Sequence, residues 1–213
     1  MKLGVFTPLF NHLSFDEMIE EVANRGLETV EIGTGGNPGT AHLDIDKLLN
    51  SSDARREYQR KLDDKGLEIS AFSTHNNPIS PLEKVAKEAD ESIRKTIKLA
   101  SLMNVPVVNG FSGIGAGNET DTQVNWPVSP WPNEFTDSYH YQWDKKLIPY
   151  WKDINKEAEA AGVKIGIEMH GGFLVHTPYT MLRLREEAGK AIGCNYDPSH
   201  MWWQGIDPVE AIK

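Results

Sequence analysis

The chain has 213 residues, of which 39% are hydrophobic and 25% charged, as in an ordinary globular protein that we expect to form one domain over residues 1–213. Its net charge of −9 argues against nucleic acid or an anionic membrane as a partner, because neither is attracted to an acidic surface. No apolar run reaches the ~18 residues of a membrane-spanning helix, and Cys194 is the only cysteine. We therefore expect a soluble, cytoplasmic protein.

Short apolar runs alternate along the chain with segments that have the periodicity of amphipathic helices. The first helical segment has the clearest boundaries. Ser14 and Glu17 form a capping box at its start, and Gly26 follows its end, where a left-handed residue is favoured. The expected strands are residues 3–9, 29–33, 68–75, 105–111, 164–170 and 191–197. The expected helices are residues 14–25, 45–65 (one helix or two), 81–103, 144–161 and 177–188, with a last helix from residue 207.

Strands that alternate with helices predict an α/β fold with a parallel sheet, because each crossover returns the chain to the same end of the sheet. The pattern alone allows either an open doubly wound sheet or a (βα)8 barrel. A dinucleotide-binding sheet is disfavoured by residues 33–40, "GTGGNPGT". Pro38 there occupies the position of the last fingerprint glycine, and no helix begins at that point.

Polar and titratable side chains collect where the expected strands end. In parallel α/β folds this edge of the sheet carries the functional groups, and an acid or imidazole within an apolar run needs a partner. The candidate residues are Glu31, His75, Asn109, Glu168, His170, Asp197 and His200. Of these, we expect Glu31, His75, Asn109 and His170 to bind substrate. For a single residue such as Glu31, an ion pair at the sheet edge is the ordinary alternative.

Glu168 and Asp197 are the strongest pair among these candidates, because they follow neighbouring strands that lie ~4.8 Å apart. Two carboxylates at matching strand ends could share a divalent cation. Mn²⁺ is the ion we expect, with Mg²⁺, Co²⁺ or Zn²⁺ as alternatives if histidines join the ligands.

Residues 114–143 form a connection too long to be a simple turn. The segment is rich in proline and carries several aromatic residues, Trp143 among them, so we expect it to cover the strand ends as a wall of a binding pocket. Trp202 follows His200 and could line the same cavity, so Trp143 and Trp202 are both candidate substrate-binding residues. The alternative is a surface excursion packed by its own aromatic side chains.

Four stretches of the sequence resemble the sugar phosphate isomerase/epimerase family of xylose isomerase-like TIM barrels. They are "IEMHGG" at residues 167–172, "NYDPSHMWWQGIDPVEAI" at 195–212, "STHNNPISP" at 73–81 and "HLDIDKLL" at 42–49. The resemblance extends over essentially the whole chain. Gly171 stands where many relatives have proline.

The resemblance implies a TIM-type barrel with a divalent metal held by a Glu, an Asp, a His and a second Glu on its last four strands. The first two correspond to Glu168 and Asp197. It also makes His200 a residue that contacts substrate oxygens and His75 a pocket histidine. The chain has about six βα units, whereas a complete barrel needs ~250 residues, so we expect the seventh and eighth strands and their ligands to be absent. Whether the chain is naturally this short is left open.

The function that follows is a metal-dependent isomerase or epimerase acting on a small sugar by proton transfer through an enediolate. Its candidate catalytic residues are Glu168 and His200. The alternatives are a non-catalytic sugar-binding barrel and, less favoured by the negative charge, a metal-dependent phosphodiesterase acting on abasic DNA. We also expect weak metal binding and little or no activity of the 213-residue chain, because two ligands leave an ion mostly hydrated. Unpaired edges on the first and last strands would favour a homo-oligomer.

Overall fold

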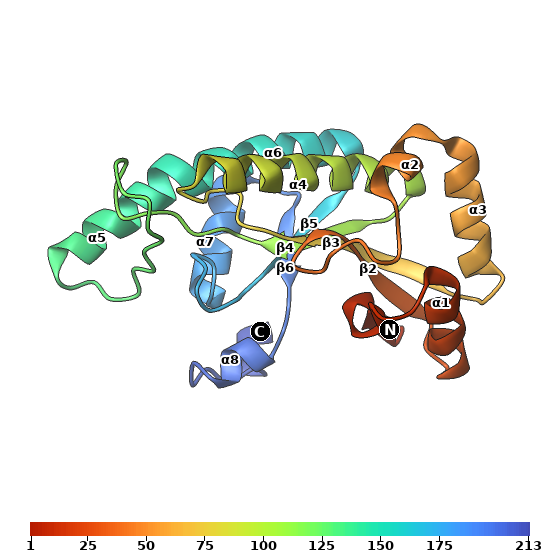
Figure 1. Cartoon of the computed structure of the whole chain (residues 1–213). Coiled ribbons are helices and arrows are strands. Elements are labelled where there is room, and N and C mark those ends of the chain that lie inside the picture. Colours follow the sequence, from red (N-terminus) through yellow and green to blue (C-terminus); the bar gives the residue numbers. More distant parts are fainter.

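The computed structural model describes residues 1–213 and contains one parallel sheet whose six strands follow each other in chain order (Figure 1). The strands are β1 (Gly4–Phe6), β2 (Thr29–Gly36), β3 (Glu68–His75), β4 (Val107–Phe111), β5 (Lys164–Glu168) and β6 (Ile192–Asn195). Each strand is parallel to its neighbours. The expected α/β fold is therefore confirmed, with the strand order of a TIM-type barrel of about six βα units.

Helices and helical turns connect all the strands. They are η1 (Thr7–Phe10), α1 (Phe15–Asn24), α2 (Ile45–Asn50), α3 (Ser52–Asp63), α4 (Glu83–Met103), α5 (Asn133–His140), η2 (Tyr141–Leu147), α6 (Ile148–Ala161), α7 (Pro178–Ala188), α8 (Ser199–Trp202) and η3 (Glu210–Ile212). Helices α4 and α6 lie side by side over one face of the sheet, and α8 lies beyond the opposite face (Figure 1). None of the helices combines the length and the apolar character that a membrane span requires.

Several boundaries differ from the expected ones for local reasons. The first strand stops at Phe6, because Pro8 opens a 3₁₀ turn directly after it. The helix expected over residues 45–65 is two helices, since Ser51 ends α2 and caps the start of α3 with its side chain. Strands β5 and β6 end two residues earlier than expected, so His170 and Asp197 lie in the loops that follow them.

The two faces of the sheet differ in composition, because successive residues of a strand point to opposite sides. The outer face is apolar and packs against the helices. Phe72, Val108, Ile165 and Ile192 belong to this core and are almost fully buried. Burial of such side chains stabilises the fold by about 1.5–3 kcal/mol each.

The inner face carries small and polar residues in register. One row across the sheet is Ser73, Asn109, Gly166 and Gly193. The next row toward the strand ends contains Phe111, Glu168 and Asn195. The candidate site therefore lies on the inner face, directly above the row that contains the two glycines.

Candidate active site

The carboxylate of Glu168, at the end of β5, is the centre of a cluster at the strand ends. Its Oε2 accepts hydrogen bonds from His75 Nε2 at 3.0 Å and from Asn195 Nδ2 at 3.1 Å. Its Oε1 accepts one from His200 Nε2 at 3.2 Å. The donors come from β3, β6 and α8, so three separate parts of the chain fix this one group. Only 14% of the Glu168 side chain is exposed.

Asp197 approaches the same imidazole as Glu168. Its Oδ2 lies 3.6 Å from His200 Nε2, and its Oδ1 accepts a hydrogen bond from the backbone N–H of Ser199 at 2.8 Å. The Asp197 side chain is more open than that of Glu168, with 41% exposed. The structure thus brings the two expected carboxylates to one nitrogen atom.

The surroundings of Glu168 favour its charged form. Burial by itself raises the pKa of Glu168, because it removes water from the carboxylate. The hydrogen bond from His75, together with favourable electrostatic interactions with His75 and His200, outweighs this effect. Asp197 opposes them as a like charge, yet the net pKa of Glu168 is lowered. The carboxylate is therefore held in its charged form, in which it can bind a cation or accept a proton.

His170 lies beside His200, with ring centres 4.1 Å apart. Its Nδ1 is 2.6 Å from the carbonyl oxygen of Gly171. An Nδ1–H that donates to a carbonyl leaves Nε2 as a free lone pair, the usual arrangement of a metal-binding histidine. Glu168, His170 and His200 each offer a ligand atom, and these atoms lie within 4.8 Å of one another. With Asp197 nearby, carboxylate and imidazole donors of this kind fit a divalent cation.

Aromatic rings form one side of the cluster. Phe111 stacks on Phe173 with ring centres 4.3 Å apart and meets His75 edge to face at 4.6 Å. The Nε1 of Trp126 donates to the carbonyl oxygen of Phe173 at 2.8 Å, so the long segment after β4 anchors the loop after β5. That segment therefore contacts the loop after β5, and Trp126 makes the contact.

Two of the expected binding residues lie apart from the hydrogen-bonded cluster. Asn109 is buried one row below Glu168, against Gly166. Glu31 accepts a hydrogen bond from the hydroxyl of Ser73. Both line the inner face of the sheet, but neither has a hydrogen bond to Glu168.

The expectation that Trp143 binds substrate is wrong. Trp143 lies in η2 and is 0% exposed within the hydrophobic core, where the guanidinium of Arg183 covers its ring at 4.4 Å. A large aromatic side chain on a helix that covers the sheet is stabilised by burial, and it then cannot reach a ligand. Trp202 and Trp203 are neighbours in the chain after His200. Trp203 packs against Gly171, whereas 69% of Trp202 is exposed.

Sequence reasoning did not identify Asn195, Phe111 and Phe173 as members of the site. For Asn195 and Phe111, the alignment of neighbouring strands could have predicted their place in the site. Each is in register with Glu168 on a neighbouring strand and therefore shares its face and height. Phe173 lies in an irregular loop, where the spacing of residues along the sequence does not predict which way a side chain points.

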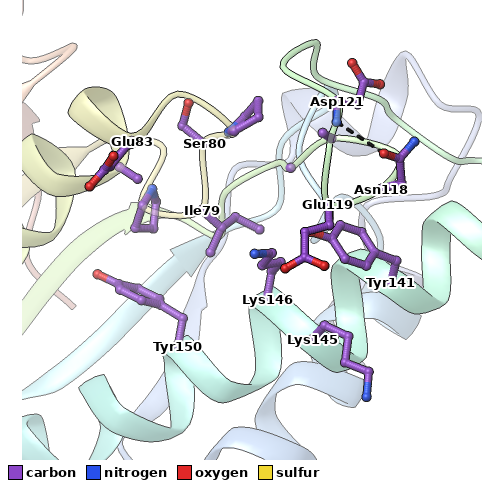
Figure 2. A pocket seen from close by; sticks show the side chains of 15 residues that line it. Ile79, Ser80, Glu83, Asn118, Glu119, Asp121, Tyr141, Lys145, Lys146 and Tyr150 are labelled. Carbon is purple, nitrogen blue, oxygen red and sulfur yellow. Dashed lines mark hydrogen bonds between the residues drawn. The ribbon is translucent and has the colours of Figure 1, made fainter.

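A separate cavity of about 400 Å³ lies between the start of α4, the segment after β4, and η2 with the beginning of α6 (Figure 2). It contains none of the expected site residues. The residues that line it include both acids and bases: Glu83, Glu119, Asp121, Lys145 and Lys146. These opposite charges favour neither an anion nor a cation.

Comparison with known proteins identifies the fold and its relatives. The model of a family described as xylose isomerase-like TIM barrel matches residues 19–213. The uncharacterized protein YfiH of Bacillus subtilis (strain 168) is 40% identical over 217 residues, an alignment that covers 100% of this chain and 69% of YfiH.

Two solved structures have the same fold at low identity. The probable 3-DHS dehydratase AsbF of Bacillus anthracis, involved in petrobactin synthesis, superimposes with a TM-score of 0.69 at 20% identity, over 100% of this chain and 68% of AsbF. A D-tagatose 3-epimerase-like protein superimposes with a TM-score of 0.69 at 22% identity, over 100% of this chain and 70% of its own.

Proposed function

Because the chain belongs to the xylose isomerase-like TIM barrel family, we propose that it is a divalent-metal-dependent isomerase or epimerase of a small sugar or sugar derivative. The observation that carries this proposal is the environment of the Glu168 carboxylate. It is buried at the strand ends, its pKa is lowered, and imidazoles and a second carboxylate surround it. The likeness to a D-tagatose 3-epimerase-like protein supports a sugar as the substrate.

Glu168 and Asp197 would hold the cation, with Nε2 of His170 as a further donor. Two carboxylates favour a hard ion, so Mn²⁺ or Mg²⁺ is the first choice, while the imidazole also admits Co²⁺ or Zn²⁺. A bound divalent cation supplies a positive charge that polarises a substrate carbonyl and stabilises the negative charge that develops on its oxygen.

The residues of the chain would direct the proton transfer. His200 Nε2 lies between the two carboxylates and can donate to a substrate hydroxyl, while the Phe111 and Phe173 rings offer an apolar surface to carbon atoms. The Glu168 carboxylate would accept the proton from the carbon next to the carbonyl, which leaves an enediolate. Return of that proton to the opposite face inverts the centre, and its return to the adjacent carbon exchanges an aldose for a ketose.

A direct test uses proton exchange, which does not require the natural substrate to be known in advance. Free ketohexoses are incubated with the protein and Mn²⁺ in D₂O, and NMR detects deuterium at the carbon next to the carbonyl. Because His170 adds a donor to the two expected carboxylates, we expect measurable exchange that EDTA abolishes and that Glu168→Gln reduces to background. Exchange that survives both changes would exclude the proposed role of Glu168.

A dehydratase is a second candidate, because AsbF superimposes as well as the epimerase-like protein does. Dehydration also begins with removal of a proton next to a carbonyl, and it ends with loss of a hydroxyl from the next carbon as water. The product is a conjugated enone. Its ultraviolet absorbance would distinguish this reaction from epimerisation on the same panel of substrates.

A further inference from the structure

We propose that His75 is a positioning residue whose Nε2–H holds Oε2 of Glu168 and leaves Oε1 as the oxygen presented to a ligand. This role differs from the direct substrate contact expected from the sequence. It rests on the proposed function in one respect, because Glu168 must be a cation ligand for its orientation to matter.

The direction of the hydrogen bond follows from the chemistry of the two partners. His75 ends β3 and Glu168 ends β5, and Nε2 lies 3.0 Å from Oε2. A carboxylate can only accept, so Nε2 carries the hydrogen. His75 is only 4% exposed, which leaves almost none of its ring for contact with a substrate.

The ring has no other polar anchor. His75 Nδ1 is buried without a hydrogen-bond partner. The rings of Phe6 and Phe111 lie next to it, with centres at 5.8 Å and 4.6 Å. An unpartnered buried nitrogen destabilises a fold, and an aliphatic side chain would suit these apolar surroundings better. The bond to Glu168 is therefore the feature that explains a histidine here.

The donors to Glu168 divide by their location. His75 and Asn195 belong to strands of the sheet, and both donate to Oε2. His200 belongs to the short helix α8 and donates to Oε1. Strands held by ladder hydrogen bonds on the sheet are the more rigid support. Oε2 is thus the fixed oxygen, and Oε1 is the oxygen that an incoming cation or substrate can take over from His200.

The first test measures Mn²⁺ affinity by isothermal titration of the full chain and its variants. We expect His75→Leu to weaken binding by about 10–100-fold, the usual effect of losing a group that orients a metal ligand. His75→Gln should retain most of the affinity, because its amide N–H replaces Nε2–H. His42→Leu is the matched control. His42 is also 4% exposed and bonds a backbone oxygen of Phe10, so its loss should leave Mn²⁺ affinity unchanged.

Three results would overturn the proposal. They are unchanged affinity in His75→Leu, equal weakening by His75→Leu and His75→Gln, and an equal effect of His42→Leu. The second result would make the imidazole itself a ligand, and the third would reduce the effect to general loss of stability. Thermal unfolding of each variant shows that the compared proteins are folded.

A second measurement, made on the unaltered protein, does not depend on metal binding or on the folding of variants. Long-range ¹H–¹⁵N NMR reports which ring nitrogen of His75 carries the hydrogen, with the His75→Gln spectrum identifying the signal. We expect the hydrogen on Nε2, and a hydrogen on Nδ1 alone would disprove the bond to Glu168. If the unaltered chain binds no Mn²⁺, the proposed function loses its cation, and this measurement alone decides the role of His75.

Discussion

The inner face of the sheet offers a sharp test, because two paired glycines there have very different surroundings. Gly166 and Gly193 are in register on β5 and β6. A Cβ at position 166 would lie 2.2 Å from Oδ1 of buried Asn109, far inside contact distance. A Cβ at position 193 would lie 3.7 Å from the carbonyl oxygen of Ile165, an ordinary contact. The same substitution should therefore have opposite effects at neighbouring positions.

We expect Gly166→Ala to destabilise the protein by about 1–3 kcal/mol, the usual effect of overpacking a filled interior. For a chain of this length that corresponds to a fall in Tm of about 2–12 °C. Gly193→Ala should be neutral or stabilising by about 0.4–1 kcal/mol, because alanine restricts the unfolded chain without strain in the folded one. Thermal and urea unfolding followed by circular dichroism measure both values.

The cause can be isolated with Asn109→Ala, which removes the obstructing side chain. In that background Gly166→Ala should have little additional effect, so the two substitutions should be strongly non-additive. Equal stability of Gly166→Ala and Gly193→Ala would refute the reasoning. Additive effects in the double variant would show that Asn109 is not the obstacle.

Other predictions concern the site, the loops and the sheet edges. Glu168→Gln should lower Mn²⁺ affinity by more than tenfold in isothermal titration without unfolding the chain, because a neutral amide replaces the central carboxylate; unchanged affinity would place the ion elsewhere. Gly171→Ala should displace the Trp203 ring, whose nearest atom lies 2.2 Å from the added Cβ, and so change tryptophan fluorescence; an identical spectrum would contradict this contact. Trp151→Phe should reduce the free energy of unfolding by about 1–3 kcal/mol, since Trp151 Nε1 donates to the buried carbonyl of Ser112. Size-exclusion chromatography should show self-association, because β1 and β6 each have one unpaired edge, and a monomer at all concentrations would show that these edges do not pair.

Much of the fold could be predicted from local chemistry. The capping box of Ser14 and Glu17 is present, and Asn104 and Gly162 adopt left-handed conformations after α4 and α6. Such signals act within a few residues, so they can be recognised without knowing the tertiary structure. The boundaries near Pro8 and Ser51 were harder to predict. A 3₁₀ turn replaces the end of the expected strand at Pro8, and Ser51 both ends one helix and caps the next.

The sequence by itself determined the order of strands and helices, the family resemblance and the side chains that stand at the strand ends. Only the tertiary structure decided which atoms meet. His75 and Glu168 are 93 residues apart, and the sheet order brings them to one hydrogen bond. Trp143 lies in the core and not in the site, because an aromatic side chain is stabilised by burial wherever apolar surface is available to cover it. Periodicity defines the face of a residue inside a regular element, whereas partners across the sheet and directions within loops depend on packing between distant segments.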